Sequence, residues 1–221
     1  MTTLNEFFDK IYYINLARRL DRLDHIEYQL NKNNVFAERV EAIDGLYSKF
    51  SSIYSVDVDK KQSTLPGDSK ISSFEAGLVA THKLILIDAL KNNYNSILIL
   101  EDDIVFSPSF SEKFNDVALD IPPDWDIIYL GATHKGPSIK KHSSYLNIAT
   151  NILGCHAIGL RSTVFEKLLA ASTFNNPIDV SYEKELQNFN SFVLASPLIS
   201  QKEGFFSDLR FLINPLRAFP F

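Results

Sequence analysis

The feature that most constrains the fold is a run of four consecutive large apolar residues, Ile97 to Leu100. A strand buried on one face alternates apolar and polar residues, whereas a continuous run indicates a short strand that is covered on both faces. Such a strand requires a layer above and a layer below its sheet, as in α/β proteins. The run therefore predicts a central strand of an α/β domain.

The segments before this run alternate between strand and helix patterns. Residues 11–16 are apolar and rich in β-formers, so we expect a strand there, and a second one over residues 35–43 that ends at the turn signal Asp44-Gly45. Between these strands, apolar residues recur every three or four positions and predict a helix: Leu20, Leu23, Ile26 and Leu30.

The same alternation continues through residue 130. Ser72 and Glu75 have the spacing of a capping box, so we expect a helix to begin there. Another helix is expected near Ser107-Pro108 and a strand over residues 126–130. Alternating strands and helices favour a mostly parallel central sheet flanked by helices.

The second half of the chain carries weaker patterns. We expect strands near residues 145–150 and 156–160, and helices over residues 162–171 and 181–190. Residues 46–70 are polar, and we interpret them as a long loop of the kind that is often functional. A length of 221 residues suits a single domain, residues 1–221, that buries a sizeable core.

Charge and cysteine content exclude several classes of protein. The chain has 22 basic and 27 acidic residues and a formal net charge of −5, which argues against a general nucleic-acid binder. Cys155 is the only cysteine, so one chain holds neither a disulfide nor a Cys-based zinc site. We expect Cys155 to be a small buried apolar residue.

The two ends of the chain bear on localisation. The start lacks the basic region and apolar run of a secretory signal, and no apolar stretch approaches the ~20 residues of a membrane-spanning helix. We therefore expect a cytoplasmic protein. The tail at residues 210–221 mixes two arginines with apolar and aromatic residues, and either contacts a membrane surface or packs back on the domain.

Three adjacent carboxylates follow the central strand: Glu101, Asp102 and Asp103. Ligands of open α/β sheets bind just beyond the carboxyl ends of the strands, and an extended backbone projects the first and third side chains to the same side. A hard cation such as Mn²⁺ or Mg²⁺ relieves their repulsion and stabilises a diphosphate leaving group. The alternative is an acidic loop that caps the following helix.

Other enzymes also place aspartates after apolar strands. The chain has no Gly-x-x-x-x-Gly-Lys-Ser/Thr loop, which weakens the hypothesis of a P-loop ATPase. A metal-dependent phosphoryl hydrolase with Asp102 or Asp103 as nucleophile stays an alternative. Against it, Glu101 occupies the position where a phosphoaspartyl enzyme has its first aspartate.

Three stretches together resemble glycosyltransferase family 25, which includes bacterial lipooligosaccharide galactosyl- and glucosyltransferases and collagen galactosyltransferases. The stretches are Tyr13–Arg22, Ser73–His82 and Ile97–Ile104. Asp44-Gly45 and residues 177–179 match weaker features, and the resemblance spans residues 11–180. The chain departs from the family at Thr81, where a serine is usual, and at residues 76–78, which lack the common Gly-Cys.

The resemblance implies a GT-A-like nucleotide-sugar-binding fold, a UDP-sugar donor, Mn²⁺ or Mg²⁺, and inversion at the anomeric carbon. We expect a hexosyltransferase that moves galactose or glucose to a glycan or glycolipid acceptor such as lipooligosaccharide. Residues 1–130 would bind the donor and residues 131–221 the acceptor. A lipid-linked acceptor would give the tail a reason to lie peripherally at the inner membrane face. A non-catalytic carbohydrate-binding protein of the same fold is the remaining alternative.

The resemblance also assigns expected roles to residues near the donor. Asn15 and Leu16 would contact the uracil or ribose, and Glu101 or Asp102 the ribose. Glu75 and His82 would lie beside the donor, although Glu75 is also explained as a capping residue and His82 as a core histidine. The diphosphate would pair with one or more of Arg18, Arg19 and Arg22, unless these form a solvated basic face.

The metal would be held by Asp103 and Glu101, with Asp208 or His156 as a further ligand. Inversion requires a base, and Asp179 is the candidate, with Glu183 as the fallback. Asp179 is otherwise explained as a helix N-cap. Asp44 is interpreted as a turn residue, and His134 as a residue that could serve the acceptor.

Overall fold

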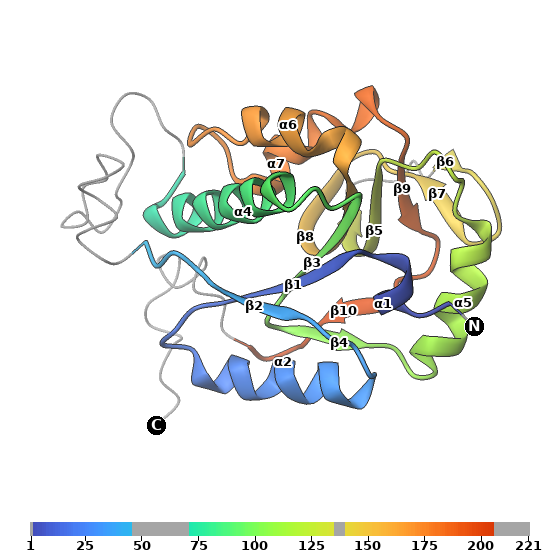
Figure 1. Ribbon diagram of the computed structural model, residues 1–221, viewed down its shortest axis with the longest axis horizontal. Coiled ribbons are helices and arrows are strands. Elements are labelled where there is room, and N and C mark those ends of the chain that lie inside the picture. The colour runs from blue at the N-terminus through green and yellow to red at the C-terminus, as the bar shows by residue number, and fades with distance from the viewer. Residues whose placement is uncertain (1, 46–70, 135–139, 206–221) are drawn as a thin grey trace.

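A central eight-stranded sheet organises the computed structural model, which describes residues 2–45, 71–134 and 140–205 (Figure 1). The strand order is β2-β1-β3-β8-β5-β9-β7-β6. The strands of this sheet are β1 (Lys10–Asn15), β2 (Glu38–Glu41), β3 (Ser96–Glu101), β5 (Ile127–His134), β6 (Lys140–Lys141), β7 (Leu146–Ile148), β8 (Ile152–Arg161) and β9 (Ser191–Leu194).

Most strands of the sheet point the same way. β1 pairs in parallel with β2 and β3, and β5 pairs in parallel with β9. β8 lies antiparallel between β3 and β5, and β7 is antiparallel to both β9 and β6. In the described part of the sheet, only β7 and β8 therefore run against the other strands. The predicted fold class, a mostly parallel sheet flanked by helices, is confirmed.

Helices and a small second sheet cover the two faces (Figure 1). One face carries α4 (Ser73–Lys91), α6 (Ser162–Ala171) and α7 (Ile178–Glu183). The other face carries α2 (Leu20–Lys32), α5 (Phe110–Asp120) and the antiparallel pair β4 (Ile104–Phe106) and β10 (Ile199–Gln201). The chain also forms α1 (Leu4–Phe7) and a 3₁₀ turn at Leu186–Asn188.

The apolar run of β3 divides its side chains between two cores. Ile97 and Ile99 pack in the core under α4 and α6, whereas Leu98 and Leu100 pack in the core on the α2 and α5 side. All four side chains are fully buried. The strand is thus covered on both faces, which confirms the interpretation of the run and places the end of β3 at the middle of the domain.

Several element boundaries differ from the sequence predictions. The strand expected over 35–43 covers only Glu38–Glu41. The helix expected over 181–190 was wrong: α7 begins at Ile178, directly after Pro177, and ends at Glu183. Proline is favoured at the start of a helix. The backbone N–H groups there have no hydrogen-bond partner within the helix, so the N–H that proline lacks is not missed. The helix expected near Ser107-Pro108 begins at Phe110.

Two predicted segments, the loop at residues 46–70 and the tail at residues 210–221, lie outside the described residues. Within the described ranges, no helix combines the length and apolar character needed to cross a membrane.

The start of α4 is fixed by local contacts. Ser72 Oγ accepts a hydrogen bond from the Glu75 N–H at 3.2 Å, and Glu75 Oε2 accepts one from the Ser72 N–H at 2.7 Å. This is the capping box that the sequence predicted.

The segment that follows β2 packs directly on the backbone of α4. A Cβ atom at Gly77 would lie 2.3 Å from the Ile43 carbonyl oxygen, and one at Gly45 would lie 2.0 Å from the Ser73 carbonyl oxygen. Both positions therefore require glycine. The Thr81 hydroxyl accepts from the Ile43 N–H at 2.9 Å and donates to the Gly77 carbonyl at 2.8 Å. The hydroxyl that Thr81 shares with the usual serine thus joins this segment to α4.

Replacing Thr81 by valine tests this connection. The change keeps the shape of the buried side chain but leaves the Ile43 N–H without its acceptor, which we expect to lower the free energy of unfolding by about 1–3 kcal/mol. Thr81→Ser keeps the hydroxyl and is the matched control. Urea denaturation of the two variants measures the difference, and equal stabilities would refute the role of the hydroxyl.

Candidate functional site

The acidic cluster lies where the sequence placed it, at the carboxyl end of β3. Glu101 is the last residue of the strand, and Asp102 and Asp103 form the turn into β4. Asp102 and Asp103 are buried, with 6% and 8% of their surfaces exposed. β1 lies alongside in parallel register, with Ile14 opposite Glu101, so Asn15 ends its strand next to the turn.

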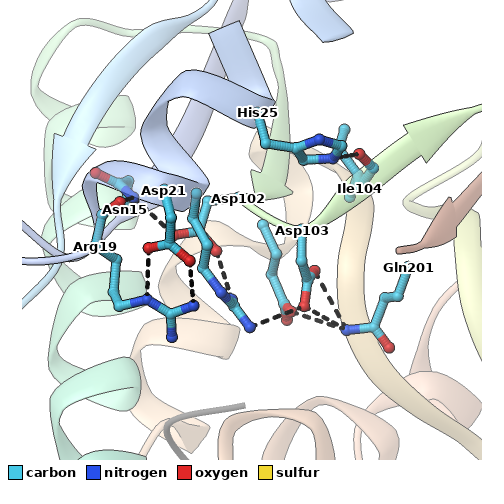
Figure 2. A network of polar contacts seen from close by, with 10 residues as sticks. Asn15, Arg19, Asp21, His25, Asp102, Asp103, Ile104 and Gln201 are labelled. Carbon is cyan, nitrogen blue, oxygen red and sulfur yellow. Dashed lines mark hydrogen bonds and ion pairs between the residues drawn. The ribbon is translucent and has the colours of Figure 1, made fainter. Parts of the chain in front are cut away.

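Asp102 is buried and is held by two side chains (Figure 2). Its Oδ2 accepts a hydrogen bond from Asn15 Nδ2 at 2.7 Å, and its Oδ1 pairs with Arg22 Nη1 at 2.6 Å. Asn15 is held in turn by Arg39, whose Nη2 donates to Asn15 Oδ1 at 2.8 Å. Burial raises the pKa of Asp102, and Arg22 and Asn15 oppose that shift.

Glu101 and Asp103 converge on one amide group. Gln201 Nε2 lies 3.3 Å from Glu101 Oε2 and 3.4 Å from Asp103 Oδ1 (Figure 2). The first and third carboxylates therefore meet, as predicted, but β3 ends at Glu101, so the turn at Asp102-Asp103 rather than an extended backbone brings them together. Burial of Glu101, together with the charges of Asp103 and Asp102, raises the pKa of its carboxyl to about 8. Two carboxylates thus face each other with incomplete compensation.

These two carboxylates line a pocket of about 640 Å³. Its wall combines the ends of β1 and β3, the start of α4, the start of α7, β8 and the segment at residues 201–205. Both halves of the chain therefore contribute to it. Seven of the predicted site residues line it: Leu16, Arg22, Glu75, Glu101, Asp102, Asp103 and Asp179.

Asp179 enters the pocket from the first turn of α7. Its Oδ2 accepts from the Gly154 N–H at 3.1 Å and its Oδ1 from the Val180 N–H at 2.8 Å. The N-cap of α7 is Pro177, so Asp179 does not occupy the N-cap position that was its structural alternative. Glu183, the fallback base, lies in the last turn of α7 and is not among the residues that line the pocket.

Four of the predicted donor-binding residues lie outside the pocket lining. Asn15 is 1% exposed and supports Asp102 from behind. Arg18 pairs with Asp44 at 2.6 Å, so Asp44 has an ion-pair role beyond that of a turn residue. Arg19 pairs with Asp21 at 2.8 Å. His82 is fully buried in α4, as its core-histidine interpretation requires.

Three candidates remain, and the structure describes the side chain of one of them, His156. His156 is 4% exposed and is not among the lining residues, and burial lowers its pKa to about 4. His134 is the last residue of β5. Asp208 lies outside the described residues. Among the described residues, no three His, Cys, Asp or Glu side chains are grouped to hold a metal ion.

Sequence reasoning missed the segment that closes one side of the pocket. Gln201, Lys202, Glu203, Gly204 and Phe205 all line it, and Gln201 directly contacts the acidic cluster. The segment arrives there because β10 pairs antiparallel with β4, which puts Gln201 opposite Ile104. No local motif marks residues 201–205; the only available signal was their mixture of polar and charged residues after an apolar stretch.

The sequence of the chain is similar to those of known proteins. Residues 8–171 match the family described as Glycosyltransferase family 25 (LPS biosynthesis protein). Mouse procollagen galactosyltransferase 2 is 26% identical over 238 residues, which cover 96% of this chain and 35% of that protein. Human inactive glycosyltransferase 25 family member 3 is 28% identical over 139 residues, which cover 59% of this chain and 23% of that protein. The chain thus spans only a minor part of the length of these curated relatives.

A solved structure of similar size was also found. It is a glycosyltransferase involved in the glycosylation of the major capsid of PBCV-1, with a TM-score of 0.48 and 12% sequence identity. The match covers 89% of this chain and 93% of that one.

The raised pKa of Glu101 predicts a pH-dependent stability. Its carboxyl keeps a proton in the folded state up to about pH 8, whereas the unfolded chain loses it near the ordinary value of 4.5. Stability is therefore full below pH 4.5 and falls as the pH rises towards 8. Glu101→Gln removes this loss, so its stability relative to wild type should increase between pH 5 and pH 8.

Denaturant unfolding in the presence of a chelator measures this difference. Glu112→Gln, at an exposed position of α5, is the control. Its free energy of unfolding should differ from that of wild type by the same amount at pH 5 and at pH 8. A Glu101→Gln advantage that is the same at pH 5 and pH 8 would show that the folded carboxyl titrates normally.

Proposed function

The chain belongs to glycosyltransferase family 25, and from that premise we propose that it is a metal-dependent, inverting hexosyltransferase. The observation that carries the proposal is the arrangement of acids around one pocket. Glu101 and Asp103 converge on one wall, and Asp179 stands on the wall formed by α7. A cation site and a separate carboxylate are the two elements that this reaction requires.

The chemistry of the donors suits Mn²⁺ or Mg²⁺. Both cations prefer oxygen ligands, and both carboxylates of the pair already point at one partner, the amide nitrogen of Gln201. That N–H group carries partial positive charge and occupies the kind of position that suits a cation. The metal would neutralise the donor diphosphate and the charge that develops on the leaving nucleotide. Asp208 remains a proposed further ligand.

The pocket also suits a nucleoside-diphosphate sugar, for which UDP is the proposed nucleotide. Its volume falls in the usual range for small-molecule sites. Apolar side chains that suit a base and ribose also line the pocket: Ile14, Leu16, Ala42, Ile43 and Phe74. Glu75 lines the pocket as well, although its carboxylate is occupied by the capping box.

Asp179 is the proposed base. The acceptor oxygen attacks the anomeric carbon and transfers its proton to Asp179 as the bond to the diphosphate breaks, and the electron pair leaves with the nucleotide. Asp179 is suited to this because its carboxylate is fixed by two backbone N–H groups while it lines the pocket. We propose galactose or glucose as the sugar and a glycan or glycolipid, such as lipooligosaccharide, as the acceptor, in the cytoplasm or peripherally at the inner membrane face.

One alternative has a specific observation in its favour. A relative of this chain is named an inactive family member, so a carbohydrate-binding protein without transferase activity is a second candidate. The phosphoryl hydrolase alternative is disfavoured for Asp102, because both oxygens of that side chain are occupied by Asn15 and Arg22.

Thermal unfolding with UDP, in the presence and absence of Mn²⁺, tests the proposal. A ligand that binds only the folded state raises the apparent stability. We expect stabilisation by UDP that requires Mn²⁺, followed by transfer or slow hydrolysis of a UDP-hexose. Metal-dependent binding without turnover on any acceptor would favour the carbohydrate-binding alternative, and absence of binding would refute the transferase.

Asp103→Asn should abolish Mn²⁺-dependent UDP binding while the protein stays folded. The change removes one proposed charged ligand but keeps the side-chain shape, and the shorter contacts to Arg22 and Asn15 are those of Asp102. Asp116→Asn, on an exposed position of α5, is the matched control. Titration calorimetry with UDP and Mn²⁺ gives the affinities, and an unchanged affinity would refute the role of Asp103.

Asp179→Asn should spare donor binding and lower transfer by about 10²–10⁴-fold, the usual contribution of a general base. The asparagine Oδ1 still accepts from a backbone N–H, so α7 should keep its position. Glu183→Gln is the contrasting variant, and its transfer rate should stay near that of wild type because Glu183 does not line the pocket. Full transfer by Asp179→Asn would exclude Asp179 as the base.

A further inference from the structure

The charges that line the pocket are strongly unbalanced. Among the described residues, its wall carries six acidic residues and two basic ones, Arg22 and Lys202; the acids are Glu75, Glu101, Asp102, Asp103, Asp179 and Glu203. A diphosphate is itself an anion, so its entry into this pocket requires positive charge in addition to any bound metal. The two basic residues are therefore the candidates for contact with it.

Arg22 is already engaged by the acidic cluster. Its Nη1 lies 2.6 Å from Asp102 Oδ1 and its Nη2 lies 3.5 Å from Asp103 Oδ2, and the side chain is buried. Pulling the guanidinium towards a phosphate would leave Asp102 as a buried charge without its partner, which is costly. Arg22 is thus better suited to hold the cluster than to bind the donor.

Lys202 is in the opposite situation. Its side chain is exposed at the pocket, and among the described residues it forms no ion pair. Its Nζ lies 4.3 Å from the centre of the Phe205 ring and 3.4 Å from His25 Nδ1, so an aromatic ring and a histidine, rather than a carboxylate, accompany the ammonium group. Its charge remains available to an anion.

The backbone fixes Lys202 next to the proposed cation site. The Lys202 N–H donates to the Asp103 carbonyl oxygen at 2.7 Å, and β10 places Gln201 against the carboxylates of Glu101 and Asp103. A group that bridges the metal and the ammonium would need to be anionic, compact and able to accept from both. A diphosphate meets these requirements, and lysine serves it as a point charge with rotatable donors.

We propose that Lys202 binds the diphosphate of the donor, beside the metal that Glu101 and Asp103 hold. The proposal rests on the proposed function, because it assumes a nucleoside-diphosphate donor in this pocket. Arg22 and Lys202 then divide two tasks: the arginine keeps the acidic cluster in position, and the lysine neutralises the substrate. The ammonium also lies where it stabilises negative charge on the departing diphosphate.

Calorimetric titration of Lys202→Met with UDP and with uridine, each with Mn²⁺, tests this role. Methionine keeps the length of the side chain and removes its charge. We expect UDP affinity to fall about tenfold or more, as for loss of a charge-assisted hydrogen bond, with uridine affinity unchanged. Lys202→Arg should restore most of the UDP affinity, and Lys113→Met, at an exposed position of α5, should have no effect.

Each outcome decides a separate point. If wild type binds UDP and Lys202→Met binds it equally well, the role of Lys202 is refuted and the proposed function stands. Equal losses for UDP and uridine would show that Lys202 shapes the nucleoside site instead of contacting phosphate, and would also refute the proposal. If wild type itself does not bind UDP, the proposed function fails and this inference fails with it.

Discussion

The buried interaction of Asp102 with Arg22 and Asn15 is the constraint on which the site depends. A carboxylate with 6% of its surface exposed needs a charged or hydrogen-bonding partner for each oxygen, and Asp102 has one on each. The contacts join the turn after β3 to the end of β1 and to α2. With Asp102 held in this way, Glu101 and Asp103 on either side of it meet the Gln201 amide at the pocket.

The same arrangement leaves an electrostatic deficit that a cation would fill. Arg22 makes its shorter contact with Asp102, at 2.6 Å, and its longer one with Asp103, at 3.5 Å, while the Gln201 amide lies between Glu101 and Asp103. The pKa of Glu101, raised to about 8, reflects this. The fold thus fixes the positions of Glu101 and Asp103 but leaves their negative charges without full compensation. This is typical of a site that is completed by its ligands.

Signals that are local in the sequence predicted the fold class and much of the pocket. The apolar run, the capping box and the three acids each depend on a few neighbouring residues, and each lies in the structure as expected. The division of roles among the acids was not predictable, because it depends on where Arg22 and Asn15 meet Asp102. Gln201 lies 100 residues from Glu101 in sequence, and only the pairing of β10 with β4 brings them together. His82 shows the opposite case. It belongs to a stretch that resembles the family, yet its side chain lies in the core and not at the pocket.

The burial of His82 nevertheless connects it to the chemistry of the pocket. Its Nδ1 lies 3.3 Å from the Tyr182 hydroxyl, and the two rings meet edge to face with centres 5.6 Å apart. Tyr182 belongs to α7, the helix that carries Asp179, whereas His82 belongs to α4, whose first turn carries Glu75 to the pocket. Burial lowers the pKa of His82 to about 4, so the imidazole stays neutral and the contact persists at neutral pH. α4 therefore supports α7, the helix that presents the proposed base. His82 lies outside the pocket lining and still contributes to the spacing between these two helices.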